Sequence, residues 1–191
     1  MKKTIIVALF LAMCSTAFAQ DKKFSIGFGL GGSFASSKFE DVKQKGAGVN
    51  GFLNFYYNVN SKLSLGLEYN GATIVIKPED DMGINFEATG LSSFSAKGLY
   101  HFSENKVRPY AGIGLGLYNV SPGKIGSGEN FIEFEKASSF GFAPEVGLKL
   151  GWFQIAALYH MIPSVSFSDD YNPSYNNFEI RIAANIGLVS N

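Results

Sequence analysis

The stretch from Arg108 to Tyr118 reads Arg-Pro-Tyr-Ala-Gly-Ile-Gly-Leu-Gly-Leu-Tyr, and it decides the fold. Its apolar residues alternate with a second set that consists of Tyr110, three glycines and Tyr118. Because successive side chains of a strand point to opposite faces, one face of this segment is apolar and the other is nearly bare. A strand of a water-soluble barrel would carry charged residues on its second face. The pattern therefore predicts a strand with its apolar face toward lipid and its small residues toward a narrow barrel lumen.

The same alternation recurs in seven further segments, which short and long polar links separate in turn. The segments are Phe24–Phe34, Val49–Val59, Leu63–Asn70, Ser93–Phe102, Phe140–Lys149, Phe153–Met161 and Phe178–Leu188. The long links are Ser36–Gly46, Lys77–Glu87, Ser121–Lys136 and Pro163–Asn176. This order predicts an all-β fold, an eight-stranded antiparallel up-and-down transmembrane barrel with its four long loops outside the cell. The apolar run from Ala72 to Ile76 predicts that the third strand projects beyond the membrane.

The first residues have the pattern of a secretory signal peptide. Met1-Lys2-Lys3 is basic, an apolar run from Ile5 to Met13 follows, and Ala17-Phe18-Ala19 offers small residues before a cut. The apolar run is too short for a membrane-spanning helix, which needs about 20 residues. We therefore expect residues 1–19 to be removed and residues 20–191 to form one barrel domain. The single cysteine, Cys14, lies in this leader, so we expect the mature chain to have no disulfide and no thiolate metal site.

Composition and charge favour the inside-out orientation of the two strand faces. Aromatic residues make up 15% of the chain, charged residues 17%, and there are 22 glycines. Six charged residues fall on the polar faces of the predicted strands, too few for a wall that faces water: Glu68, Lys97, Glu145, Lys149, Glu179 and Arg181. Aromatic residues near strand ends are typical of the girdles at membrane interfaces. A net charge of zero gives no indication of nucleic acid as a partner.

The ordered set of eight segments resembles the small eight-stranded outer-membrane β-barrel family, the OmpA-type transmembrane domain and its OmpX-like relatives. The most characteristic pieces are Arg108–Gly116, the sequence Gly-Leu-Tyr-His-Phe at 98–102, and Ala-Leu-Tyr at 157–159. The resemblance covers essentially all of the mature chain. It implies a monomeric, porin-like protein of the Gram-negative outer membrane, surrounded by outer-membrane lipid and lipopolysaccharide and inserted by the barrel-assembly machinery. It also implies a salt-bridged, largely closed interior.

The lumen charges have two interpretations. They could form a polar relay or a constricted pore, or they could pair with one another and fill the lumen. Buried charges need partners, and side chains fill the interior of an eight-stranded barrel, so we expect the paired arrangement. His160 is expected to be a hydrogen-bonded lumen residue rather than a ligand.

Other candidate sites are weaker. The spacing of His101 and Ser103 matches a motif of lipid A deacylases, but the predicted topology places it at the wrong end for outer-leaflet lipid. The acidic runs Glu79–Asp81 and Asp169–Asp170 lack the ligand spacing of a Ca²⁺ site. The glycines of 27–32 lack the helix that a phosphate-binding loop needs. We therefore expect no catalytic residue, cofactor or metal ion.

Three function classes follow. The first is a closed barrel that displays its loops for structural, adhesion or interaction roles with an extracellular partner that the sequence does not identify. The second is a small passive pore. The third is a lipid-modifying enzyme, which would need a nucleophile and a base together at the outer rim.

Overall fold

The computed structural model describes residues 22–39, 42–77, 85–86, 89–121, 125–127, 130–132, 137–165 and 174–190. Eight of the described strands close into an antiparallel barrel in the order β1-β11-β10-β9-β6-β5-β3-β2, and β2 pairs back with β1. The barrel strands are β1 (Lys22–Phe39), β2 (Val42–Asn58), β3 (Leu63–Lys77), β5 (Thr89–His101), β6 (Val107–Ser121), β9 (Ala137–Leu150), β10 (Phe153–Ile162) and β11 (Ser174–Ser190). The predicted fold class is thus confirmed. The predicted signal peptide lies outside the described residues.

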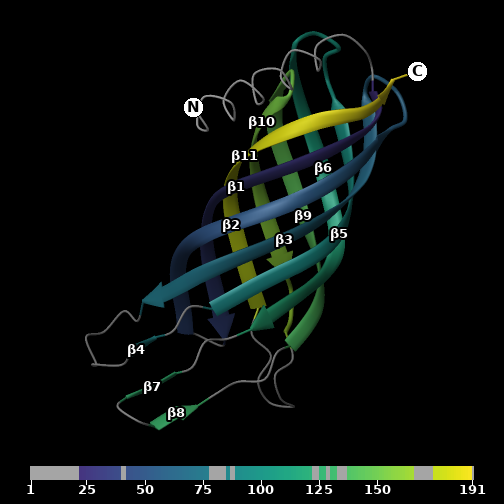
Figure 1. Cartoon of the computed structure of the whole chain (residues 1–191). Helices are drawn as coiled ribbons and strands as arrows, with labels where there is room; N and C mark the ends of the chain where they lie inside the picture. Colours follow the sequence, from purple (N-terminus) through teal and green to yellow (C-terminus); the bar gives the residue numbers. More distant parts are fainter. Residues whose placement is uncertain are drawn as a thin grey trace, which may run out of the picture.

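The two ends of the barrel differ in their connections. At the short-turn end, which is at the top of Figure 1, tight turns join β2 to β3, β5 to β6 and β9 to β10. The last of these turns contains Gly151, whose φ of 62° lies in the left-handed region that favours glycine. The opposite end, the long-loop end, carries three more short strands: β4 (Asn85–Phe86), β7 (Ile125–Ser127) and β8 (Asn130–Ile132). These form a small sheet in the order β4-β7-β8 below the barrel in Figure 1, so they link the predicted second and third long loops.

The predicted first long loop, Ser36–Gly46, is wrong. β1 continues to Phe39 and β2 begins at Val42, with an unbroken register from Phe34↔Ala47 to Phe39↔Val42. This segment is a long hairpin, because both strands continue through the polar residues that were expected to form a loop. Its described outward residues, Ser36 and Lys45, are polar rather than apolar. Three long connections therefore remain in place of the predicted four.

The two faces of the wall have the predicted orientation through the middle of the barrel. In β6, Ile113, Leu115 and Leu117 are exposed, with fractions of 49%, 48% and 58%, whereas Tyr110 and Tyr118 are buried. Strands on both sides show the same arrangement, which gives an apolar outer belt around the barrel. The apolar face of the stretch that predicted the fold thus points outward.

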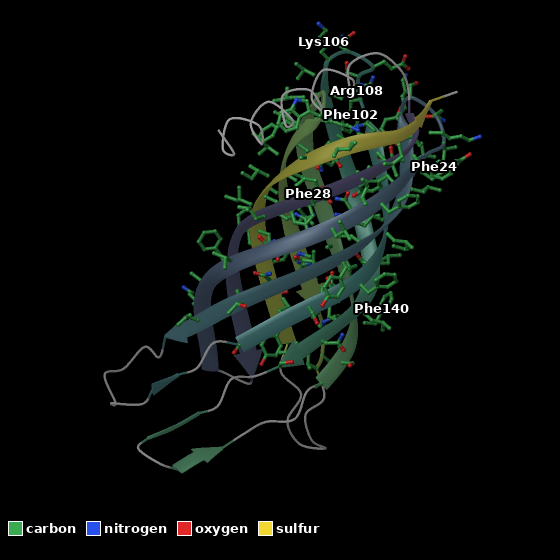
Figure 2. The ribbon with its side chains drawn as sticks, viewed as in Figure 1. Phe24, Phe28, Phe102, Lys106, Arg108 and Phe140 are labelled. Carbon is green, nitrogen blue, oxygen red and sulfur yellow. The ribbon has the colours of Figure 1, made fainter. Side chains whose placement is uncertain are left out.

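Aromatic residues border this belt at both ends. At the short-turn end, Phe24 stacks on Phe55 with ring centroids 5.7 Å apart, and Tyr100 meets Phe102 at 5.5 Å. Toward the long-loop end, exposed aromatic side chains lie on five strands: Phe34, Tyr69, Phe94, Phe140 and Phe178. Figure 2 shows Phe24 and Phe102 toward one end and Phe140 toward the other. The described part of the chain contains no helix long and apolar enough to cross a bilayer.

The chemistry of the faces inverts at the long-loop end. There the inward residues are apolar and buried, and they form one cluster: Ala72, Ile74, Leu91, Tyr118, Val120, Ala137, Ile162 and Val165. The outward neighbours include Thr73, Asn119 and Ser138, all exposed. An apolar interior with a polar exterior is the pattern of a barrel in water. The wall therefore extends past the apolar belt, as the sequence predicts for the third strand.

Candidate functional site

A buried ion quartet occupies the middle of the lumen. It consists of Glu68 on β3, Lys97 on β5, Glu145 on β9 and Arg181 on β11, each no more than 4% exposed. Inward positions of four strands converge there because alternation turns every second residue to the lumen. Gly31 lies opposite Arg181 in the register and Gly114 lies opposite Lys97, so small neighbours leave room for the long side chains.

Each charge of the quartet has an opposite charge beside it. Arg181 donates from Nη1 to Glu68 Oε1 at 2.9 Å and from Nη2 to Oε2 at 3.3 Å, a two-pronged contact. Lys97 Nζ donates to Glu68 Oε2 at 3.0 Å and also pairs with Glu145. Arg181 Nη2 lies 3.6 Å from Glu145 Oε2. Two cations thus bridge two carboxylates, which is the arrangement that buried charges require.

A second carboxylate site, the Glu179 nest, lies beside the quartet on the side of the long-loop end. Four neutral side chains donate to the fully buried Glu179 carboxylate, at 3.3, 2.5, 3.1 and 2.8 Å respectively: Ser33, Asn50, Asn70 and Asn177. Arg181 Nη1 approaches Glu179 Oε2 at 3.7 Å and so links the nest to the quartet. The nest ties β1, β2, β3 and β11 together through a single carboxylate.

His160 on β10 connects the nest to the apolar cluster. Its Nε2 lies 3.2 Å from Glu179 Oε2, and its Nδ1 lies 2.9 Å from the hydroxyl of Tyr118. The quartet and the nest together hold three carboxylates, Glu68, Glu145 and Glu179, and two basic side chains, Lys97 and Arg181. The expected role of His160 as a hydrogen-bonded lumen residue agrees with these contacts.

Neutral side chains fill the lumen on the side of the short-turn end. Tyr110 donates to Glu145 Oε1 at 2.7 Å, and Gln154 Nε2 donates to both the Tyr110 hydroxyl and Glu145 Oε1. Asn185 donates to Gln154 Oε1 at 2.8 Å. The Phe52 ring lies under Arg181, with 4.1 Å between the guanidinium carbon and the ring centroid. A second apolar cluster closes this part of the lumen: Tyr56, Leu99, Tyr110, Ala156 and Leu158.

Of the six predicted lumen charges, the structure brings five together: the quartet and Glu179. Lys149 is only partly buried and lies toward the short-turn end. There, its charge and that of Arg108 are close enough to act on the His101 ring. The asparagines of the nest were not predicted as site residues. The sequence feature that could have identified them is asparagine at inward positions of β2, β3 and β11, where the other residues are commonly glycine, serine or alanine.

His101 and Ser103 are not arranged as a catalytic pair. The His101 ring is buried, with its Nε2 3.4 Å from the hydroxyl of Ser64, whereas Ser103 accepts a hydrogen bond from the backbone N–H of Asn105 within the turn. The acidic runs at 79–81 and 169–170 lie outside the described residues. Within the described strands and turns, no three His, Cys, Asp or Glu side chains are grouped to hold a metal ion.

Comparisons with known proteins agree with this architecture. The family model "Outer membrane protein beta-barrel domain" matches residues 5–185. The fold is similar to that of Neisserial surface protein A, with a TM-score of 0.62 and 16% identity over 87% of this chain and 97% of that one. It is also similar to Ail, the attachment invasion locus protein of Yersinia pestis, with a TM-score of 0.53 and 18% identity over 86% and 99% of the two chains. No curated protein matches the sequence.

Proposed function

We propose that this chain, which belongs to the family of outer membrane protein beta-barrel domains, is a closed membrane anchor that presents its long connections to partners outside the cell. The observation that carries the proposal is the filled lumen. The quartet and the Glu179 nest occupy its middle, and buried apolar clusters lie beyond them on both sides. A solute passing through would have to displace paired, buried charges, which costs several kcal/mol for each ion separated from its partner.

The outer membrane is the location that the wall supports. The apolar outer belt has aromatic borders at both ends, and family membership implies the outer membrane rather than another bilayer. We place the long-loop end outside the cell, because outer-membrane barrels have short periplasmic turns and longer extracellular loops. The polar exterior at that end then lies above the hydrocarbon region.

The positions of the polar groups support a non-enzymatic role. The described carboxylates of the lumen are paired with bases or held by amides, so none is available as a general base for an external substrate. Outward residues of the belt face lipid and cannot select a soluble partner. The connections at the long-loop end are the part of the chain left to present shape and charge, and the small sheet of β4, β7 and β8 joins two of them into one surface.

Shortening the three long connections tests the proposal. Replacement of residues 78–88, 122–136 and 166–173 by two-residue turns should leave the barrel able to fold, because tight turns suffice to join antiparallel strands. The shortened protein is smaller than the full-length protein, but on gels it should show the same kind of shift between unboiled and boiled samples. A heterologous Gram-negative host that displays the full-length chain should adhere to at least one of cultured epithelial cells, collagen or heparin, and adhesion should disappear with the shortened chain. Adhesion that survives the deletion would contradict the proposal.

A further inference from the structure

The two ends of the lumen differ in chemistry. At the long-loop end the inward residues form the buried apolar cluster described above. At the short-turn end they are polar or basic, and we call this set the basic mouth: Ser25, Asn58, Ser64, His101, Arg108, Lys149, Gln154 and Asn185. The second apolar cluster lies directly inside it, because Tyr56, Leu99 and Tyr110 are two positions from mouth residues on the same face. The described residues of the mouth thus include two bases and no acid.

Arg108 and Lys149 lie side by side at the mouth. They are paired directly across β6 and β9, at inward and partly buried positions. Their neighbours Val107 and Leu150 pair on the opposite, outward face, where they are 51% and 39% exposed. Arg108 Nε donates to the backbone carbonyl of Asn105 at 3.0 Å, which holds the guanidinium at the turn. Like charges directly opposite each other destabilise a sheet, so an anion between these two bases would relieve their repulsion.

His101 adds a hydrogen-bond acceptor close to these charges. The Ser64 hydroxyl donates to Asn58 Oδ1 at 2.7 Å, so it can only accept from His101 Nε2, which lies 3.4 Å away. The other ring nitrogen, Nδ1, then carries a lone pair, and it is buried without a hydrogen-bond partner in the described part of the chain. Arg108 and Lys149 are close enough for their charges to act on this ring. A ligand that suits all three side chains has a carboxylate and an N–H group close together.

Backbone hydrogen bonds hold the rim of the mouth in place. The N–H of Gly151 donates to the carbonyl of Lys106 at 3.3 Å, which ties the β9–β10 turn to the β5–β6 turn. The N–H of Asn185 donates to the carbonyl of Trp152 at 2.6 Å, which ties the same turn to β11. Figure 2 shows Lys106 and Arg108 together at this end of the barrel. A rim that is already ordered loses little conformational freedom when a ligand binds.

We propose that the basic mouth binds the carboxylate end of a short peptide, in which the last amide N–H lies next to the carboxylate. The Arg108 guanidinium presents a fork that matches a carboxylate, Lys149 adds a second charge, and His101 Nδ1 accepts the amide N–H. Lipid headgroups do not fit, because the two bases lie on the lumen side of the wall. The inference rests on the proposed orientation, which places the mouth in the periplasm. Soluble peptides and peptides attached to the cell wall are two sources of this chemistry there.

Titration of the refolded full chain in zwitterionic detergent tests the mouth. The fluorescence of Trp152, the single tryptophan, reports binding from the adjacent turn. The probes are acetyl-alanyl-alanine, its C-terminal carboxamide and acetate, and the dipeptide acid should bind most tightly. R108Q/K149Q should bind it at least about tenfold more weakly, since hydrogen bonds to charged groups are lost. The matched control K23Q/K45Q removes two exposed lysines outside the mouth and should change the affinity less than about twofold.

Four results would overturn the inference: equal binding of the acid and the carboxamide, equal binding of the dipeptide acid and acetate, equal effects of the two double variants, and displacement of the peptide by equimolar phosphatidylglycerol. Unboiled gel mobility verifies that both variants fold. Retention of the native chain, but not of R108Q/K149Q, on purified cell-wall sacculi would identify wall peptides as the source, and no retention would identify soluble ones.

Cell adhesion separates this inference from the proposed function. Hosts that display R108Q/K149Q should adhere as well as hosts that display the native chain, because the mouth lies at the end opposite the long connections. Full adhesion by a native chain that binds no peptide would remove only the inference about the mouth. Peptide binding by a native chain that does not adhere would remove only the proposed function.

Discussion

Glu68→Ala is expected to lower the free energy of unfolding by about 3–5 kcal/mol, the typical cost of removing one partner of a buried ion pair. At the centre of the lumen, Glu68 accepts a hydrogen bond from Lys97 and a bidentate pair of hydrogen bonds from Arg181. Its removal leaves Glu145 as the remaining carboxylate of the quartet, with Glu179 3.7 Å from Arg181 as the next acidic group. Urea unfolding in lipid vesicles, followed by the fluorescence of Trp152, measures the change.

Glu104→Ala is the matched control. Glu104 lies in the turn between β5 and β6, where its side chain is 57% exposed and 4.0 Å from Lys62. Exposed pairs of this kind contribute well under about 1 kcal/mol, so the unfolding midpoint should hardly move. A double variant, Glu68→Ala with Lys97→Met, should lose less than the sum of the two single variants, because their effects share one ion pair. Equal losses for Glu68→Ala and Glu104→Ala would mean that water solvates the lumen charges.

Gly29→Val is expected to destabilise the barrel by about 3 kcal/mol or more, at the upper end of the range for overpacking. A Cβ atom at Gly29 would lie 2.9 Å from the Cα of Ala183, 2.5 Å from the ring of Phe52, and closer still to the carbonyl oxygen of Ile182. The Cα of Ala183 and the carbonyl oxygen of Ile182 belong to the backbone of β11, which cannot move without breaking its register with β1. Phe52, in turn, supports Arg181. The expected result is a lower yield of the heat-resistant band on unboiled gels and a lower urea midpoint.

The control for this substitution lies on the opposite face of the neighbouring strand. At Gly51 the nearest atom to an added Cβ is 3.8 Å away, and the position is exposed in the apolar outer belt. Valine at this position adds a β-branched side chain without a steric clash, so Gly51→Val should leave stability unchanged or raise it slightly. Greater damage from Gly51→Val than from Gly29→Val would reverse the assignment of the two faces.

The barrel and most of its lumen charges were predictable for a specific reason. Side-chain alternation has a period of two, so the sequence itself assigns each residue to a face, and six charges on otherwise small faces mark the lumen. Their partners were not predictable, because pairing across a lumen depends on strand tilt and register. Glu68 and Arg181, for example, are 113 residues apart in the sequence. The same limit hid the Glu179 nest, in which Asn50 and Asn70 converge from different strands.

The first connection was mispredicted because polarity was taken as a sign of a loop. Ala35 packs against the buried apolar cluster, whereas outward positions such as Ser36 and Lys45 are polar. The alternation continues, but its chemistry has inverted because the wall has passed from lipid to water. Ala72 and Ile74 showed the same inversion. In the sequence they belong to an apolar run that no longer keeps the alternation of the preceding segment. Reading both segments by the position of each residue along the barrel axis, rather than by hydrophobicity alone, would have joined β1 to β2 by a hairpin.

Single-channel recording of the refolded full chain in a planar bilayer tests the central claim, a lumen closed by its own side chains, most directly. The paired quartet, the Glu179 nest and the two apolar clusters predict no steady conductance for a protein whose insertion is verified independently by protease protection. A reproducible ohmic current that scales with the amount of inserted protein would contradict the account and identify the chain as a small passive pore.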